Sequence, residues 1–283
     1  MKKKQIPKIA FVGQGWIGKN YADNFESRGF EVTRYSLEAE YEKNKARVGG
    51  ADVVFIAVPT PTRQGKVDSK IVEESLALVG KGSTAVIKST IEPGTTKRFQ
   101  KKFAHIYVLH SPEFLTKATA AYDTEHPARN IIGIPIESKT FRTKASSVLS
   151  LLPKAPYEII TGSDESEFIK YASNTFYYAK VVYFNILYDF AKKKKMNWPD
   201  IEASAAADPM TGPVHTKPIH KSGRGAGGIC LIKDYAAFAA LLGKTRLSAE
   251  AESVVEAIEV FNKKLLRDSG KDQQVIEEVY LKK

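Results

Sequence analysis

The segment Lys8-Ile-Ala-Phe-Val-Gly-Gln-Gly-Trp-Ile-Gly18 holds the strongest fold signal in the chain. It joins a short apolar strand, predicted at residues 8–12, to a helix predicted at residues 18–28, through glycines with the spacing GxGxxG. Glycines let the backbone approach a pyrophosphate, and the free N–H groups of a helix N-terminus bind its negative charge. The segment predicts a dinucleotide site, and the simpler alternative is a tight turn without a ligand. The predicted cofactor-binding residues here are Gly13, Gln14, Gly15, Trp16, Ile17 and Gly18.

Apolar runs continue through the first half of the chain and alternate with helical patterns. The run Ala-Asp-Val-Val-Phe-Ile-Ala-Val at residues 51–58 is nearly continuous, which is typical of a parallel strand covered on both faces. This alternation predicts a doubly wound α/β domain of the Rossmann type over residues 1–162. Its further strands are predicted at residues 30–35, 83–88, 106–110, 130–134 and 157–161.

The second half of the chain has a helical pattern. Residues 164–194 contain no proline or glycine, follow a capping Ser163 and end in lysines, which predicts one long helix. Apolar residues lie on most sides of it, so it must be buried nearly all round, and a second subunit is a natural cover. Two more helices are predicted at residues 231–242 and 248–268. We therefore expect residues 163–283 to form an all-helical dimerisation domain with a long central helix, and the chain to form a homodimer.

Composition argues against several classes of function. The 283 residues carry a net charge of +11, but the lysines are scattered and do not alternate with aromatic residues, so no nucleic-acid surface is predicted. No apolar run reaches the roughly 18 residues of a membrane helix. The histidines have no metal-ligand spacing, so no metal site is predicted. A single cysteine excludes an intramolecular disulfide and indicates a reducing, cytoplasmic compartment. The net positive charge indicates a basic surface that attracts phosphorylated ligands.

Polar loops follow three of the predicted strands. They are Val58-Pro-Thr-Pro-Thr62, Lys88-Ser-Thr90 and Ser111-Pro-Glu113. Open α/β sheets bind their ligands beyond the carboxyl ends of the strands, so we expect these loops to line a binding site. The cofactor-binding residues predicted in them are Val58, Pro59, Thr60, Thr62, Ser89 and Thr90.

The second predicted strand ends without the acidic residue that usually binds the ribose hydroxyls of NAD. The sequence there is Thr33-Arg34-Tyr35-Ser36. Arg34 and Ser36 are candidate cofactor contacts, and an arginine at this place makes NADP an alternative to NAD. In the simpler reading, Glu38 or a backbone group serves the ribose.

The segment Gly223-Arg-Gly-Ala-Gly-Gly-Ile-Cys230-Leu-Ile-Lys-Asp234 is the most informative about chemistry. Four glycines in six residues precede the only cysteine, and a helix follows. A thiolate at a helix start is stabilised, and Asp234 lies one turn further on the same face. A lone cysteine is more often a small buried hydrophobe, but the glycines around Cys230 favour a functional role.

Lys170 and Asn174 share one face of the long helix because they stand at positions i and i+4. A buried lysine is costly unless it is paired or functional. The alternative is a solvated side chain, which the apolar neighbours Ile169 and Tyr171 disfavour.

The order of these motifs resembles the UDP-glucose/GDP-mannose dehydrogenase family from Lys8 to about Asn262. The motifs are GxGxxG, the loop at 59–62, Lys88-Ser-Thr90, Ser111-Pro-Glu-Phe-Leu115 with His126-Pro-Ala-Arg129, Lys170-Tyr-Ala-Ser-Asn174, and the highly specific cysteine segment. The resemblance implies an NAD-dependent dehydrogenase that oxidises the C6 alcohol of a nucleotide sugar to a carboxylate, as in the conversion of UDP-glucose to UDP-glucuronate.

The resemblance also implies a role for each matching residue. Cys230 is the nucleophile that forms a thioester, and Lys170 and Asn174 stabilise the developing oxyanion. Asp234 orients or activates water together with Thr90, and Glu113 acts as a base on the thioester. Lys233 joins the cofactor-binding residues. The implied substrate-binding residues are Phe114, Leu115, Lys117, Gly223, Gly225, Gly227 and Gly228.

The chain departs from the family pattern at three points. Lys117 stands where the family usually has a second glutamate, and Met210 aligns with an arginine that reaches a neighbouring subunit's substrate. The family also has a third domain that holds the nucleotide half of the substrate, and the sequence ends one short segment after Asn262. A separate chain that supplies this domain is one expectation.

Three functions therefore compete. The first is a short nucleotide-sugar 6-dehydrogenase. The second is a two-domain hydroxyacid or sugar-acid dehydrogenase, which also uses a lysine and an asparagine on the long helix but needs no cysteine. The third is a catalytically degenerate, cofactor-binding member of the family, which the joint presence of Glu113, Lys170 and Cys230 disfavours.

Overall fold

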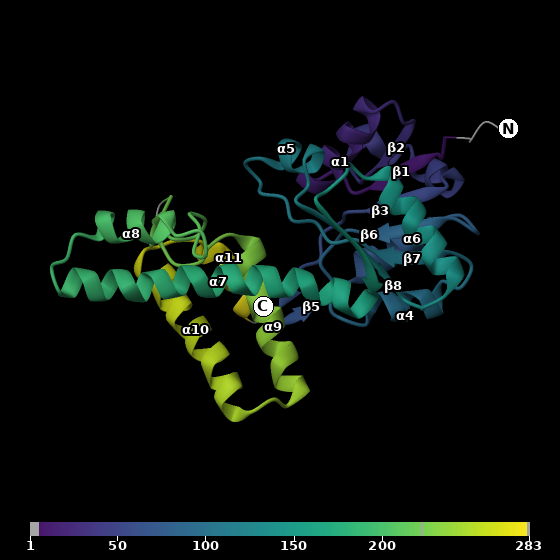
Figure 1. The fold of residues 1–283 in the computed structure, drawn as a ribbon. Coiled ribbons are helices and arrows are strands. Elements are labelled where there is room, and N and C mark those ends of the chain that lie inside the picture. The colour runs from purple at the N-terminus through teal and green to yellow at the C-terminus, as the bar shows by residue number, and fades with distance from the viewer. Residues whose placement is uncertain (1–5, 222, 282–283) are drawn as a thin grey trace. The chain divides into compact units, whose positions relative to one another are not determined.

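The computed structural model describes residues 6–221 and 223–281, which form two compact units (Figure 1). The first unit contains the described residues up to Thr60 together with Asp68–Lys170. The second contains Pro61–Val67 and the described residues from Tyr171 onward. The structure thus divides the chain within its longest helix, eight residues beyond the predicted boundary at Gly162, and the limits 1–162 and 163–283 stay a prediction for the functional domains.

A seven-stranded sheet forms the centre of the first unit. Its strand order is β2-β1-β3-β6-β7-β8-β9, and all neighbouring strands are parallel except β7 and β8. The strands are β1 (Ile9–Val12), β2 (Val32–Tyr35), β3 (Val53–Ile56), β6 (Thr84–Ile87), β7 (Tyr107–His110), β8 (Arg129–Ile134) and β9 (Tyr157–Gly162). Because β1 pairs with β2 on one side and with β3 on the other, the chain changes direction at the carboxyl end of β1, where such sheets bind ligands.

Apolar side chains cover both faces of this sheet. Ala10 and Val12 belong to one buried cluster, whereas Ile9 and Phe11 belong to another, because successive side chains of a strand point to opposite faces. The helices are α1 (Trp16–Ser27), α2 (Ala39–Glu42), α3 (Lys70–Leu76), α4 (Thr95–Lys102), α5 (Ala120–Glu125) and α6 (Lys139–Leu151), with a 3₁₀ helix at Lys45–Gly50. The predicted doubly wound α/β fold is confirmed.

The long helix α7 (Ser163–Lys193) belongs to both units and is one continuous helix (Figure 1). Asp164 in its first turn and Lys192 in its last complement the helix dipole. Within the first unit, the buried Glu167 carboxylate accepts hydrogen bonds from the N–H groups of Gly94 (2.6 Å) and Thr96 (2.7 Å), so it caps the start of α4. The opening turns of α7 are therefore anchored to the sheet domain.

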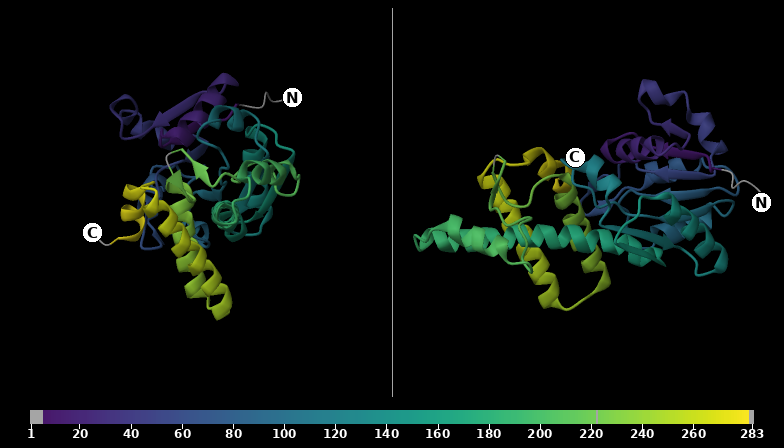
Figure 2. Two further views of the ribbon diagram at one scale, coloured as in Figure 1. Left: turned by 90° about the vertical axis from the view of Figure 1, so that its left-hand side faces the viewer. Right: turned by 45° about the horizontal axis from the view of Figure 1, so that its top comes forward.

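The second unit is helical, and Figure 2 shows α9 and α10 side by side, joined by a short turn. Tyr178 of α7 stacks on Tyr235 of α9 with ring centroids 3.9 Å apart, at the centre of the unit's apolar core. Its helices after α7 are α8 (Trp198–Ala207), α9 (Ile229–Thr245), α10 (Ala249–Asp268) and α11 (Gln273–Tyr280). Two short hairpins, which the sequence did not predict, complete it: β4 (Thr62–Arg63) with β5 (Lys66–Val67), and β10 (Ile219–His220) with β11 (Gly223–Arg224).

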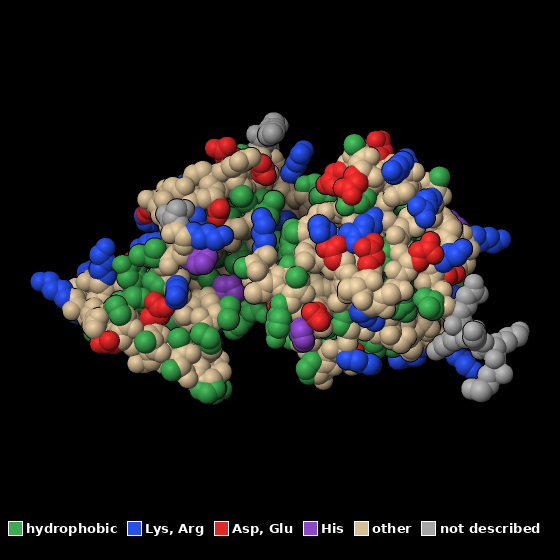
Figure 3. Space-filling model, turned by 90° about the horizontal axis from the view of Figure 1, so that it is seen from above, with side chains coloured by type: hydrophobic (Ala, Val, Ile, Leu, Met, Phe, Trp, Pro, Cys, Tyr) green, Lys and Arg blue, Asp and Glu red, His purple; other side chains and the backbone are tan. Residues whose placement is uncertain are grey.

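Charged side chains are spread widely over the surface. On the face drawn in Figure 3, Lys and Arg side chains lie among Asp and Glu side chains and form no single continuous basic patch. Among the residues that the structure describes, no helix is both long enough and apolar enough to cross a bilayer.

Candidate active site

The turn between β1 and α1 has the geometry of a phosphate-binding loop. Gly13 has a positive φ of 93°, and a Cβ atom there would lie 2.4 Å from the carbonyl oxygen of Ala57. A Cβ atom on Gly18 would lie 1.9 Å from the carbonyl oxygen of Gly13, so only glycine fits at either position. At Gly15, by contrast, a Cβ atom would meet nothing within 4 Å. Gly15 is the N-cap of α1, whose first turn holds no acidic residue, so open space and free N–H groups coincide there.

The loops after β3 and β6 are joined to each other. The Ser89 hydroxyl donates to the carbonyl oxygen of Val58 at 2.7 Å, and Thr60 is buried beside Pro59 in the first unit. Thr90 follows Ser89 and is half-buried. Thr62, which was predicted with them, belongs to the β4 strand of the second unit.

A buried ion pair connects the loop after β7 to α7 within the first unit. Lys170 Nζ donates to Glu113 Oε1 at 2.9 Å and to the Glu113 carbonyl oxygen at 2.7 Å. The other carboxylate oxygen, Oε2, accepts the N–H of Leu115 at 2.8 Å. Lys170 also lies over the ring of Phe114, 5.6 Å from its centroid, and the structure brings these predicted residues together. Lys117, further along the loop, is exposed.

Lys88 is a second buried lysine in this region, and it was not among the predicted site residues. Its Nζ donates to the carbonyl oxygen (3.2 Å) and the hydroxyl (3.3 Å) of Ser111, and lies 4.2 Å from the centroid of the Tyr21 ring. Burial lowers the pKa of Lys88 to about 7, although the nearby Glu113 carboxylate favours the charged form. The signal in the sequence was a lysine directly after an apolar strand.

In the second unit, Asp234 is the centre of a buried polar cluster. Asn174 Nδ2 of α7 donates to Asp234 Oδ2 at 2.5 Å, and Lys233 Nζ lies 2.5 Å from Asp234 Oδ1. Each carboxylate oxygen therefore has a donor, and the side chain of Asp234 is held in one orientation. Both Asn174 and Asp234 were predicted site residues, but their hydrogen bond to each other was not predicted.

Cys230 is the second residue of α9 and is half-buried. The first turn of α9 contains no acidic residue, so its free N–H groups favour the thiolate form of a cysteine placed there. Asp234 follows four residues later in the same helix. The predicted helix start is confirmed to within two residues.

The glycine-rich loop before Cys230 is held by side chains that the sequence did not single out. Asn262 of α10 accepts the N–H of Ala226 at 2.7 Å and donates to its carbonyl oxygen at 3.0 Å. Lys271 donates to the carbonyl oxygen of Gly225 at 2.9 Å, and Asp272 accepts the N–H of Gly228 at 2.7 Å. A Cβ atom on Gly223, Gly225 or Gly227 would lie less than 3 Å from a neighbouring side chain, whereas on Gly228 it would meet nothing within 4 Å. The substrate contacts predicted for these four glycines stay predictions. Met210 is almost fully exposed.

Comparisons with known proteins agree with these features. Residues 33–148 match the NAD binding domain of the UDP-glucose/GDP-mannose dehydrogenase family, and residues 164–264 match its central domain. The UDP-glucose 6-dehydrogenase of Campylobacter jejuni is 33% identical over 190 residues, covering 65% of this chain and 47% of the relative. That of Streptococcus pneumoniae is 30% identical over 267 residues, covering 80% and 66%. The chain thus spans between about half and two thirds of the length of these relatives.

Solved structures show the same fold at lower identity. A UDP-glucose dehydrogenase from Pyrobaculum islandicum superposes with a TM-score of 0.80 at 24% identity, covering 98% of this chain and 72% of the other. A 3-hydroxyisobutyrate dehydrogenase from Mycobacterium tuberculosis gives 0.70 at 17% identity, covering 96% and 99%. The family matches include residues 33–148 of the sheet domain and the long helix from residue 164 onward with the cysteine segment, and the chain therefore belongs to the UDP-glucose/GDP-mannose dehydrogenase family.

Proposed function

We propose that this chain oxidises the C6 alcohol of a nucleotide sugar to the carboxylate through a thioester on Cys230, with NAD as cofactor. The observation that carries the proposal is the position of Cys230 in the first turn of α9, one turn before the Asn174–Asp234 pair. The curated relatives are named as UDP-glucose 6-dehydrogenases, which favours the conversion of UDP-glucose to UDP-glucuronate. A reducing compartment such as the cytoplasm would keep the thiol active.

The glycine-rich turn fits a dinucleotide. Gly15 leaves open space at the start of α1, and the N–H groups there would bind the pyrophosphate. When bound, NAD accepts the hydrides that both oxidation steps release. The chain's own task on this side is to hold the cofactor and to present the loops after β3 and β6 to it.

Side chains of the chain itself would carry out the remaining chemistry. The Cys230 thiolate adds to the carbonyl carbon of the intermediate aldehyde and forms a C–S bond. Lys170 and Asn174 would stabilise the negative charge that develops on the carbonyl oxygen. After loss of the second hydride, water attacks the thioester, the C–S bond breaks, and the carboxylate leaves with the thiol restored. Asp234 and Thr90 would orient that water, and Glu113 would accept its proton.

The substrate would be bound mainly through its charge and its sugar ring. The net charge of +11 attracts a nucleoside diphosphate, and Lys117 lies exposed on the Glu113 loop. Phe114 and Leu115 of the same loop are half-buried and would contact the sugar. The glycines before Cys230 would let the substrate approach the backbone.

A hydroxyacid dehydrogenase is the second candidate function. The superposition with the 3-hydroxyisobutyrate dehydrogenase covers 96% of this chain and 99% of the other. An enzyme of that class needs Lys170 and Asn174 but not Cys230, so the two candidates predict different products and different effects of cysteine substitution.

We also propose a homodimer formed along α7. Within the second unit, one stripe of this helix leaves large apolar side chains at least half exposed, at Phe176, Tyr183, Ile186 and Phe190. Their successive spacings of seven, three and four residues place them on one face, which a second copy can cover by two-fold symmetry. Sedimentation of the wild type at micromolar concentration tests the dimer, and a stable monomer would contradict it. In a dimeric protein, Phe190→Glu should weaken the association.

The function is tested by supplying NAD with UDP-glucose, GDP-mannose, UDP-N-acetylmannosamine or 3-hydroxyisobutyrate and following NADH absorbance. We expect one of the nucleotide sugars to yield about two NADH per molecule, as oxidation of an alcohol to a carboxylate requires. Turnover of the hydroxyacid with one NADH would favour the second candidate. NADH binding without turnover of any compound would favour the degenerate family member.

A further inference from the structure

Arg34 stands where dinucleotide-binding domains discriminate between NAD and NADP. It lies on β2, one residue before the strand ends at Tyr35, and no acidic residue takes the usual place there. An arginine near this position commonly binds the 2′-phosphate of NADP. The sequence alone therefore leaves NADP as an alternative to NAD, whereas the family match is to an NAD binding domain.

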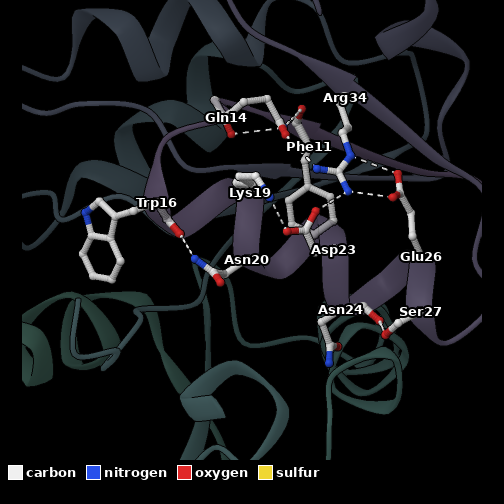
Figure 4. A network of polar contacts seen from close by, with 11 residues as sticks. Phe11, Gln14, Trp16, Lys19, Asn20, Asp23, Asn24, Glu26, Ser27 and Arg34 are labelled. Atoms are coloured by element: carbon white, nitrogen blue, oxygen red, sulfur yellow. Dashed lines mark hydrogen bonds and ion pairs between the residues drawn. The ribbon is translucent and has the colours of Figure 1, made fainter. Parts of the chain in front are cut away.

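The side chain of Arg34 is turned toward α1 and is held there by two carboxylates (Figure 4). Nε donates to Glu26 Oε1 at 2.9 Å, and Nη2 donates to Glu26 Oε2 at 2.7 Å. Nη2 also donates to Asp23 Oδ1 at 2.6 Å. These contacts follow from the register, because Arg34 pairs with Phe11 and so shares the sheet face that α1 covers.

Few donors of the guanidinium remain for a ligand. Of its five N–H groups, three point to Glu26 and Asp23, and Nη1 lies 3.4 Å from Gln14 Oε1. The Arg34 side chain is only 12% exposed. The paired carboxylates also raise the pKa of Arg34, mainly through the hydrogen bond to Glu26, so the guanidinium stays charged and paired.

The charges around Arg34 balance. Lys19 Nζ lies 2.6 Å from Asp23 Oδ2, so two cations and two carboxylates make a formally neutral group. Gln14 connects this group to the phosphate-binding turn, because its Nε2 donates to the carbonyl oxygens of Phe11 (3.3 Å) and Gly13 (3.2 Å). A 2′-phosphate at this edge would meet no surplus positive charge and would be repelled by both carboxylates.

We propose that Asp23 and Glu26 neutralise Arg34 and thereby make the site select NAD(H) over NADP(H). In this assignment α1 supplies the negative charge that the end of β2 lacks, and Asp23 and Glu26 are specificity-determining residues. The inference rests on the cofactor part of the proposed function, but not on the chemistry of Cys230.

The experiment measures binding of NADH and NADPH by fluorescence, without substrate, to the wild type and to Asp23→Asn/Glu26→Gln. We expect the wild type to bind NADH at least about tenfold more tightly than NADPH, the size of one charge-assisted hydrogen bond. The double variant should bind NADPH about tenfold more tightly than the wild type does, with NADH affinity changed less than about threefold. Adding Arg34→Met to the double variant should abolish that gain.

Two controls separate the alternatives. Glu31→Gln removes an exposed acid just before β2 that makes no contact with Arg34, so it should leave both affinities unchanged. Glu38→Gln tests whether Glu38 serves the ribose instead, and loss of the NADH preference in that variant would overturn the proposal. Unchanged melting temperatures would show that all variants are folded.

The remaining outcomes are also decisive. A wild type that prefers NADPH, or a double variant with an unchanged NADH-to-NADPH ratio, would refute the role of Asp23 and Glu26. A wild type that prefers NADH but oxidises no nucleotide sugar would break the proposed function and leave the selectivity argument supported.

Discussion

The residues proposed for catalysis are held differently in the two units. In the first unit, buried lysines hold the loop after β7: Lys170 donates to Glu113, and Lys88, which has no proposed catalytic role, donates to Ser111. In the second unit, Cys230 is placed by a backbone loop that Asn262, Lys271 and Asp272 fix through hydrogen bonds. Substitutions in the first unit should therefore lower stability by leaving a buried charge unpaired, and substitutions in the second unit should do so by displacing the backbone loop.

The largest expected effect is on turnover, from Cys230→Ala. Loss of a covalent nucleophile should lower kcat by at least about a thousandfold. NADH affinity should not change, because the glycine-rich turn is untouched. Cys230→Ser should also stop the full oxidation, and an acylated enzyme could accumulate, which mass spectrometry would detect.

This substitution also separates chemistry from packing. If Cys230 were only a buried hydrophobe, the alanine variant would lose on the order of 1 kcal/mol of stability and keep its turnover. Turnover and thermal stability are therefore measured on the same preparation. Full activity in Cys230→Ala would refute the thioester mechanism.

The next largest effect is expected in the first unit, from Lys170→Met. The Glu113 carboxylate would stay buried without its cation, which costs about 3–5 kcal/mol of unfolding free energy. Lys97→Met is the matched control, because Lys97 pairs with Asp164 at 2.8 Å on the surface and should contribute less than about 1 kcal/mol. Urea unfolding measures both. Lys170→Met/Glu113→Gln should recover most of the loss, and a double variant as unstable as the single one would argue against the pairing.

In the second unit, a backbone change should have a smaller effect on stability. Gly225 has φ of 88°, and a Cβ atom there would lie 2.8 Å from Asn262 Oδ1, so Gly225→Ala should cost about 2–3 kcal/mol through strain and the displaced loop. At Gly228, φ is 80° but a Cβ atom would meet nothing within 4 Å, so Gly228→Ala should cost only about 1 kcal/mol. The reaction rate of Cys230 with a thiol reagent should change more in the Gly225 variant. Equal effects of the two substitutions would show that Asn262 does not set the loop.

The same contrast explains what the sequence could predict. The apolar run at 51–58, the glycine turn and the long helix are local patterns, and the structure has β3, the turn and α7 at those places. The hairpin β4–β5 is not local, because its turn depends on Gln64 donating its N–H to the carbonyl oxygen of Val279. The helix α8 was missed as well, since its alanine-rich sequence has little apolar periodicity.

The candidate site was predictable to the same extent. The residue types and their chemistry were recognisable from motifs, whereas the pairing of Asn174 with Asp234 was not predicted. The residues that hold the site loops in place were not predictable, because the partners are distant in the sequence: Asn262 and Ala226 are 36 residues apart, and Lys88 and Ser111 are 23 apart. Arg34 shows the same limit, because its sequence context allows a phosphate contact, and only the register of β2 against β1, which turns its side chain toward α1, reveals its two carboxylate partners.

The last expected effect is the pH dependence that Lys88 gives the first unit. Its folded-state pKa is about 7, against an ordinary value of 10.5, because burial disfavours the ammonium. Between these pH values the unfolded chain binds more protons than the folded one, so this group makes stability rise with pH, by at most about 1.4 kcal/mol per pH unit. Below pH 7 the lysine is protonated in both states and its contribution no longer changes. The unfolding free energy of the wild type minus that of Lys88→Met should therefore increase from pH 7 to pH 9 in urea titrations. A difference that stays flat over this range would mean that Lys88 keeps its proton in the folded protein, and that the Glu113 carboxylate and the Tyr21 ring compensate its burial.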